Sequence, residues 1–476
     1  MAEQGAADST DPPGFERRRA GVLLPLGSLR PQTGTASLQA AADRFLQFLG
    51  EAGFSVWQML PVQPPDEYGS PYRSVSVHAG DPALIDTDTA SLADAHRQFR
   101  EHATAPQRQE FADFRRDMDY WLADYSLFAA ARRRHGERPW WEWPAPLRDR
   151  EPGALASLQE SGRADIEYFC FEQYLFFSRW QELRRRAQAA GILLLGDMPL
   201  YPAHDSADVW AHRGQFKLDG AGRPLCVAGV PPDYFSATGQ RWGNPVYDWE
   251  GLARTGFRWW LDRIHTQLAL FDLVRLDHFR GLEAAWEIPF AAATAEHGRW
   301  SPVPGQDLLT AVRAEHGTLP FVAEDLGTIT PEVRALRRDF GLPGMKVLQF
   351  AFGGGSDNPY LPHNHAPRHV VYTGTHDNNT TLGWFEELGP QERLRVTDYL
   401  GHPSEDMPWP LIRAALASVC RLAVVPAQDL LGLGAEHRLN TPGTSEGNWA
   451  WQLPVDVLTP ELAARLRALN ELYGRC

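Results

Sequence analysis

Eight short apolar runs, each bounded by turn residues, recur along the chain with helix-like stretches between them. They lie at residues 21–24, 54–60, 191–197, 271–277, 319–324, 344–349, 369–373 and 422–426. Continuous apolar runs of this length are typical of strands that are buried on both faces in a parallel sheet covered by helices. Eight such runs predict an α/β fold of the (β/α)8 TIM-barrel type. A doubly wound sheet is disfavoured because no GxGxxG motif follows any of the runs.

The gaps between the runs are uneven and predict two insertions. Residues 86–190 alternate apolar and charged side chains at helical spacing with few Gly or Pro, which predicts a mostly helical subdomain. Residues 201–270 are rich in Gly, Pro and Trp, which predicts a long structured loop above the rim where the strands end. We expect residues 1–19 to form a disordered tail, because they are polar, and residues 20–476 to form one barrel that carries both insertions.

The composition excludes several classes of partner. The chain has 46 Lys and Arg against 60 Asp and Glu, a formal charge of −14, and no long basic run, so it lacks the basic surface that a nucleic acid requires. No apolar run approaches the ~20 residues of a membrane helix, and no signal-peptide core is present. The four scattered cysteines form neither a disulfide framework nor a CxxC pair. We expect a soluble cytoplasmic protein, either a monomer or a homodimer.

Four of the eight runs carry an acid at the carboxyl end, namely Asp197, Asp277, Glu324 and Asp377. Barrel enzymes place their chemistry at these strand ends. A single acid there is often only the N-cap of the following helix. Four that converge on one rim are hard to explain as caps, so we interpret them as a candidate active site.

Arg275 and Asp277 lie two residues apart on a predicted strand, so their side chains project to the same side. A guanidinium beside a carboxylate favours its ionised form, as a carboxylate nucleophile needs; the alternative is a plain ion pair inside the barrel. Retaining glycosyl transfer uses two carboxyls ~5–5.5 Å apart. Asp277 and Glu324 end the fourth and fifth predicted strands, which we expect to be neighbours, and neighbouring strands lie ~4.8 Å apart. Spacing alone does not assign the two roles. Arg275 favours an ionised Asp277, which leaves Glu324 as the general acid and then base.

The segments around these acids resemble the conserved regions of the α-amylase superfamily, and they are most similar to glycoside hydrolase family 77, the amylomaltases or 4-α-glucanotransferases. The motifs are Gly196-Asp197-Met198-Pro199, Arg275-Leu276-Asp277-His278, Ala323-Glu324-Asp325 and Thr375-His376-Asp377-Asn378. Supporting stretches are Ser70-Pro71-Tyr72 and residues 203–210, 227–245, 342–352 and 358–364. The resemblance runs from about residue 20 to the end of the chain.

The resemblance implies a barrel that transfers α-1,4-glucan segments from a donor to the 4-hydroxyl of glucose or a maltooligosaccharide, with no metal and no organic cofactor. It implies that Asp277 is the nucleophile, Glu324 the acid/base and Asp377 the transition-state stabiliser. Substrate contacts are implied for Arg275, His376, Asp197, Tyr72, Ser70, Gly239, Gln240, Trp242, Asp325 and Asn448. Trp242 falls on the family's flexible lid loop, so the 201–270 insertion would carry the lid.

The sequence also departs from the family pattern beside the cleft. Arg73 stands where Gln is expected, His78 replaces Phe, Asp81 replaces Asn, and Asn379 replaces a frequent Asp. These departures, together with those at residues 25–35, bear on donor length and acceptor choice.

Other readings compete with the transferase. An α-glucan hydrolase would use the same acids in a wetter cleft, and a non-catalytic glucan-binding protein would bind sugar without turnover. A metal site at residues 204–212 has enough potential ligands, but no metal-binding motif is complete there.

Overall fold

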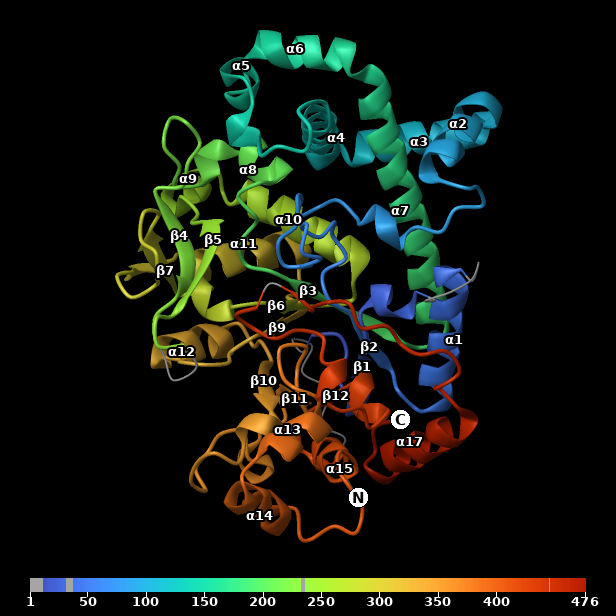
Figure 1. The fold of residues 1–476 in the computed structure, drawn as a ribbon, viewed down its shortest axis with the longest axis vertical. Helices are drawn as coiled ribbons and strands as arrows, with labels where there is room; N and C mark the ends of the chain where they lie inside the picture. Colours follow the sequence, from blue (N-terminus) through green and yellow to red (C-terminus); the bar gives the residue numbers. More distant parts are fainter. Residues whose placement is uncertain (1–11, 31–36, 233–235, 445) are drawn as a thin grey trace.

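The computed structural model describes residues 12–30, 37–232, 236–444 and 446–476. The eight predicted runs form eight parallel strands around the centre of the molecule (Figure 1). They are β1 (Arg19–Leu23), β2 (Val56–Gln58), β3 (Leu193–Met198), β6 (Leu273–Leu276), β9 (Phe321–Ala323), β10 (Gly344–Val347), β11 (His369–Tyr372) and β12 (Leu422–Pro426). They pair in the order β10-β11-β12-β1-β2-β3-β6-β9. The Ala323 amide donates to the Pro343 carbonyl at 2.8 Å, which joins β9 to the segment entering β10, so the predicted barrel is confirmed.

Helices surround this barrel because its strands are apolar on both faces. The helices of the barrel region, including α10 at the end of the 201–270 segment, are α1 (Leu38–Glu51), α10 (Arg258–Leu270), α11 (Gly305–His316), α12 (Pro331–Asp339), α13 (Thr381–Glu387), α14 (Pro390–Tyr399), α15 (Trp409–Ala417), α16 (Ala427–Leu430) and α17 (Pro460–Leu472). Ser37 caps α1 by accepting a hydrogen bond from the Ala40 amide, which satisfies one of the free amides of the first turn.

The amino-terminal segment differs from the expected tail of residues 1–19. Residues 1–11 lie outside the described part of the chain, whereas Arg19 already belongs to β1. Phe15 is 1% exposed and packs with Leu23, Val56 and Leu273 in the barrel interior. Residues 1–19 are mostly polar, so their composition gave no indication that Phe15 is buried. Its side chain fills the end of the barrel where the strands begin.

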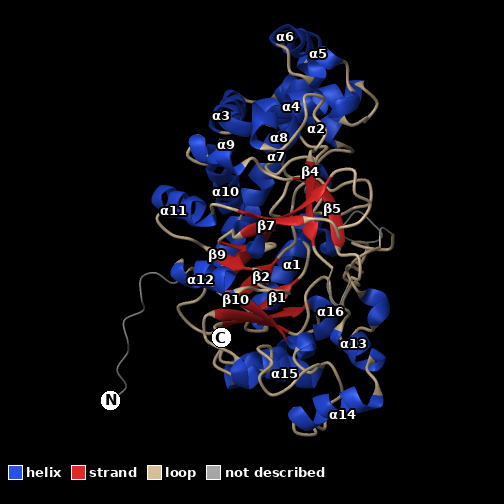
Figure 2. Cartoon of the chain, turned by 90° about the vertical axis from the view of Figure 1, so that its left-hand side faces the viewer, coloured by secondary structure: helices blue, strands red, loops and turns tan. Residues whose placement is uncertain are grey.

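The segment expected to be helical does fold into helices, most of which lie at one end of the molecule, while α7 runs from there to the barrel beside α1 (Figures 1 and 2). They are α2 (Leu92–His102), α3 (Ala105–Asp117), α4 (Asp119–Arg134), α5 (Ala145–Arg148), α6 (Pro152–Ser161) and α7 (Arg163–Ala189). Trp140 and Trp143 are buried within this subdomain. Among the described residues, no helix combines the length and apolar character needed to cross a membrane.

The segment expected to be a loop, residues 201–270, contains more regular structure than predicted. It forms α8 (Ala207–Ala211), α9 (Trp249–Arg254), α10 and two strands, β4 (Cys226–Val230) and β5 (Gln240–Pro245). These strands join β7 (Ala284–Pro289) and β8 (Arg299–Pro302) in an antiparallel sheet ordered β5-β4-β7-β8, beside the barrel (Figure 2). The pairing of β4 with β5 is irregular between Val227 and Gly229, and such short, broken strands carry a weak alternation signal.

Candidate functional site

The strand-end acids gather at the carboxyl end of the barrel. Asp197 of β3 lies opposite Arg275 of β6 in the strand register, and Leu276 lies opposite Ala323. Asp277 and Glu324 therefore follow at one level on the adjacent strands β6 and β9. The predicted adjacency of these two strands is confirmed.

Arg275 is the central cation of this cluster. Its Nη1 donates to both carboxylate oxygens of Asp197 at 2.8 Å and lies 2.9 Å from Oδ1 of Asp277. The predicted pairing with Asp277 is present, and the bond to Asp197 adds a second partner. Burial opposes the charge of Arg275, but the two carboxylates outweigh it and raise its pKa. The guanidinium therefore stays charged and fixes both acids.

Glu324 is held by two backbone amides. Its Oε2 accepts from the amide of His278 at 2.8 Å, and its Oε1 accepts from the amide of Leu326 at 2.9 Å. Burial and the negative charge of Asp277 raise the pKa of Glu324 from 4.5 to about 7, although Arg275 and the amides act in the opposite direction. Glu324 is thus partly protonated at neutral pH, as a general acid requires.

Tyr72 connects the acid cluster to the loop after β11. Its hydroxyl donates to Oδ2 of Asp197 at 2.9 Å and lies 2.9 Å from Nε2 of His376. Because the single hydroxyl proton goes to Asp197, Nε2 of His376 carries the proton in this pair. The ring of Trp449 lies 5.7 Å from Tyr72 and 6.1 Å from His376. The structure thus adds Trp449, which the strand-end signal could not reveal.

Asp377 is half-exposed and lies beside His376, whose Nε2 is 3.4 Å from its Oδ2. Burial opposes ionisation of Asp377, but the charge of His376 and hydrogen bonds from His376 and Asn440 lower its pKa. Asn440 donates to Oδ1 of Asp377, and Arg438 donates to its backbone carbonyl at 2.9 Å. Asn440 and Arg438 lie about sixty residues along the chain from Asp377, and no motif in the sequence indicated them.

The predicted lid residues approach the site from the antiparallel sheet. The ring of Trp242 lies edge-on to the ring of His278, with centroids 4.8 Å apart, and its Nε1 donates to Oε1 of Gln240 at 3.1 Å. Gly239 has a φ of +68° at the turn before β5, a conformation that favours glycine. Residues 233–235 of this segment lie outside the described residues.

Comparison with known proteins decides the family. The model of glycoside hydrolase family 77, described as 4-alpha-glucanotransferase, matches residues 24–94 and 89–458. The 4-alpha-glucanotransferase of Thermus thermophilus is 48% identical over 496 residues, covering 96% of this chain and 99% of that protein. The chain belongs to glycoside hydrolase family 77. The chloroplastic/amyloplastic 4-alpha-glucanotransferase of Arabidopsis thaliana is 42% identical, covering 96% of this chain and 86% of that protein.

Two solved amylomaltase structures share the fold of this chain. The amylomaltase of Streptococcus agalactiae in complex with acarbose is 33% identical, with a TM-score of 0.90 over 96% of this chain and 100% of that chain. The amylomaltase of Corynebacterium glutamicum shares the fold at 18% identity, with a TM-score of 0.73 over 97% of this chain and 75% of that chain. The resemblance inferred from the strand-end motifs is confirmed.

Three residues expected to bind substrate in this family 77 chain make other contacts. Asp325 pairs with Nε of Arg337 at 3.2 Å and accepts from the Met345 amide at 2.7 Å, so its carboxylate holds the junction between β9 and β10. The backbone of Ser70 bonds Asp66 and Arg73, and the side chain of Asn448 bonds Thr441 and Thr444. The carboxylate of Asp325 thus faces α12 and β10, whereas that of Glu324 faces the amide of His278.

The potential metal ligands at residues 204–212 have separate partners. His204 bonds the Gly222 carbonyl at 2.8 Å and stacks on Trp141, Asp205 pairs with Arg132, and Asp208 accepts from the Val77 amide. Among the described residues, no group of three or more His, Cys, Asp or Glu is arranged to hold a metal ion.

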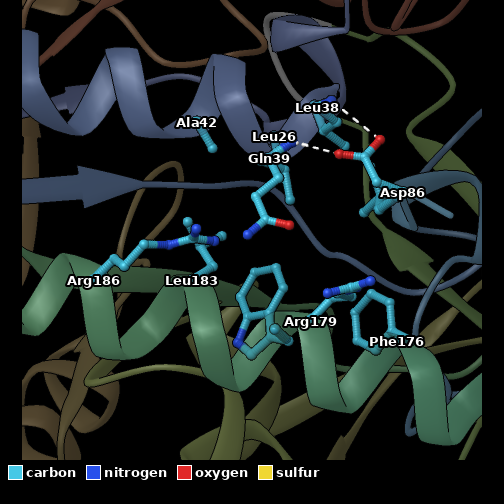
Figure 3. Close-up of a pocket in the computed structure, with 11 residues that line it drawn as sticks. Leu26, Leu38, Gln39, Ala42, Asp86, Phe176, Arg179, Leu183 and Arg186 are labelled. Carbon is cyan, nitrogen blue, oxygen red and sulfur yellow. Dashed lines mark hydrogen bonds between the residues drawn. The ribbon is translucent and has the colours of Figure 1, made fainter. Parts of the chain in front are cut away.

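A pocket of about 40 Å³ lies between α1 and α7 (Figure 3). None of the predicted site residues lines it. Asp86 at its edge accepts hydrogen bonds from the amides of Leu38 and Gln39 and from the hydroxyl of Ser37, so it caps α1.

Proposed function

We propose that this family 77 chain is a 4-α-glucanotransferase that moves α-1,4-glucan segments by a retaining double displacement. The observation that carries the proposal is the Asp277–Glu324 pair on adjacent strands. One carboxylate is held by Arg275, and the other has its pKa raised to about 7. Two carboxyls in unlike environments are the arrangement that retaining glycosyl transfer uses.

In the first half of the reaction, Glu324 protonates the glycosidic oxygen while a carboxylate oxygen of Asp277 attacks the anomeric carbon. The carbon–oxygen glycosidic bond breaks, the leaving chain departs with a new 4-hydroxyl, and the donor fragment stays on Asp277 as an ester. Asp377 is ionised and held by Asn440, so it is placed to bond sugar hydroxyls and to distort the ring.

In the second half, the Glu324 carboxylate removes the proton from the 4-hydroxyl of the acceptor. The resulting oxygen attacks the anomeric carbon and releases Asp277, so two inversions retain the α configuration. Transfer requires the acceptor to reach the ester before water does. Trp242 is the candidate shield, because its ring covers His278, the residue next to the nucleophile.

Incubation with maltotriose alone, followed by chromatography of the products, tests this function. We expect glucose together with a ladder of longer oligosaccharides, while the total number of reducing ends stays constant. An Asp277→Asn variant should produce no ladder. Reducing ends that rise in step with bond cleavage would instead show a hydrolase, and sugar affinity without turnover in the unmodified protein would show a binding protein.

We further propose that the protein works in a reducing compartment, the cytoplasm, as a monomer or homodimer. Cys170 and Cys420 are buried as free thiols, and Cys226 and Cys476 are also unpaired. Some relatives are chloroplastic or amyloplastic, so fractionation of the source cells tests the compartment. Sedimentation tests the oligomeric state.

A further inference from the structure

The loop between β11 and α13 carries His376 and Asp377, and both of its ends meet one buried carboxylate. Asp429, on α16 directly after β12, is 1% exposed. Its Oδ2 accepts from the hydroxyl of Thr373 at 2.6 Å, at the start of the loop. At the end of the loop, Oδ1 accepts from the amide of Thr381 at 2.7 Å, and Oδ2 accepts from its hydroxyl at 2.6 Å.

The interior of this loop is held partly by its own side chains and partly by neighbours: Arg438 and Asn440 bond Asp377, and Gln349 donates to the Asn379 carbonyl at 2.9 Å. Oδ1 of Asn378 accepts from both the amide and the hydroxyl of Thr375, at 2.9 and 2.8 Å. The Thr375 hydroxyl in turn lies 3.3 Å from the amide of Asp377. These short-range bonds fix the shape of the loop but not its position relative to the barrel.

Asp429 is the side chain that bonds both ends of the loop. Strands β11 and β12 are paired in parallel, so Asp429 reaches the loop from the neighbouring strand end. Burying a carboxylate is costly unless strong hydrogen bonds compensate, and Asp429 forms no salt bridge among the described residues. The three hydrogen bonds are its compensation, and all of them go to the two ends of this loop.

We propose that Asp429 is a positioning residue. By holding both ends of the loop, it keeps His376 and Asp377 in the correct position relative to Asp277 and Glu324 when the substrate binds. This inference rests on the proposed function. A displacement of about 1 Å in a substrate-positioning group costs about 100-fold in rate. Loss of the clamp should therefore lower kcat more than it raises KM, because Asp377 acts chiefly on the transition state.

The main variant is Asp429→Ala, which removes all three acceptor contacts. We expect kcat on maltotriose to fall about 10- to 100-fold with KM changed by less than about threefold. Asp429→Asn should recover most of this loss, because its amide oxygen still accepts from the Thr381 amide and both hydroxyls can turn to accept from its NH2 group. Equal kcat in Asp429→Ala and the unmodified protein would overturn the proposal.

A second pair of variants removes one contact and keeps the buried carboxylate. Thr381→Val loses the hydroxyl at nearly constant shape, whereas Thr381→Ser retains it. We expect kcat to fall in the Val variant and to stay close to that of the unmodified protein in the Ser variant. This pair tests the clamp if Asp429→Ala does not fold, and indistinguishable Val and Ser variants would contradict it.

Glu172→Gln is the matched control, because Glu172 is also a buried carboxyl, 5% exposed, but lies on α7 away from the loop. It should lower the midpoint of thermal unfolding without lowering kcat. A purely structural role for Asp429 predicts this same behaviour for Asp429→Ala.

Proton NMR of His376 tests the geometry without turnover. His376 contacts Tyr72 and Asp377, and Asp197 and Arg275 also face it. Burial opposes its protonation, but the charge of Asp377 raises its pKa. In Asp429→Ala the pKa should fall, and in Glu172→Gln it should not change. An unmodified protein inactive on maltotriose would refute the proposed function, while an unchanged His376 pKa in Asp429→Ala would refute the clamp.

Discussion

The pH dependence of donor cleavage follows from the environment of Glu324. Burial and the charge of Asp277 raise the pKa of Glu324 from 4.5 to about 7. That change corresponds to about 3 kcal/mol in favour of the protonated form. With a pKa of 4.5, fewer than about 1% of the molecules would carry this proton at pH 7, whereas about half carry it at a pKa of 7. The shift therefore makes the general acid about 100-fold more available at neutral pH.

The rate should fall as the pH rises, because the general acid acts only when it is protonated. As the pH rises through 7, Glu324 loses its proton and kcat/KM for maltotriose should fall about tenfold per pH unit. Initial rates between pH 5 and 9, with the ionic strength held constant, measure this alkaline limb. α-Maltosyl fluoride is the matched donor, because fluoride departs without a proton from the enzyme. The transfer of its maltosyl group to Asp277 should therefore not slow down as the pH rises above 7.

The variant Glu324→Gln provides the control. It should cleave maltotriose at least about 100-fold more slowly and retain much of the first step with α-maltosyl fluoride. A flat kcat/KM for maltotriose from pH 6 to 9, or the same alkaline limb with both donors, would refute the assignment of Glu324 as the general acid.

Three further predictions concern the groups around this pair. Arg275→Met leaves Asp197 buried without its cation and should lower the free energy of unfolding by about 3–5 kcal/mol at pH 8. The loss should shrink as the pH falls, because burial raises the pKa of Asp197 and protonation removes its charge; an equal loss at pH 5 and pH 8 in urea unfolding would contradict this. Tyr72→Phe removes the hydroxyl between Asp197 and His376 and should cost about 1–3 kcal/mol in kcat/KM for maltotriose. Trp242→Ala should raise the share of bond cleavages that end in new reducing ends, and an unchanged ratio would exclude a shielding role for this ring.

The barrel could be predicted because its strands are buried on both faces, so each appears as an apolar run that ends in a turn. The same reasoning located Asp197, Asp277, Glu324 and Asp377, since function in this architecture follows the strand ends. The antiparallel sheet of β4, β5, β7 and β8 was not predicted. Trp286 and Trp300 are paired across β7 and β8, but Trp286 is only partly buried and Trp300 is exposed, so these strands show no continuous apolar run.

The supporting residues escaped prediction for a different reason. Asn440 and Trp449 lie in a segment without regular structure, and only the folded chain brings them to Asp377 and Tyr72. Asp429 did carry a usable signal, because it lies three residues after β12. The first turn after a strand, where Asp377 also lies, is therefore a place where such polar residues can be expected.

The charge balance of the site explains why one of its acids keeps its proton. Asp197, Asp277 and Glu324 surround a single guanidinium, and Arg275 gives its hydrogen bonds to Asp197 and its ion pair to Asp277. Glu324 receives only backbone amides, which are weaker than a full charge in stabilising an ionised carboxylate. Glu324, which has no direct contact with the cation, is therefore the carboxyl that is partly protonated at pH 7, so the assignment of nucleophile and acid follows from which carboxylates the arginine contacts. Asp377 does not contact Arg275 directly; instead, the charge of His376 and the hydrogen bonds from His376 and Asn440 lower its pKa and keep it ionised.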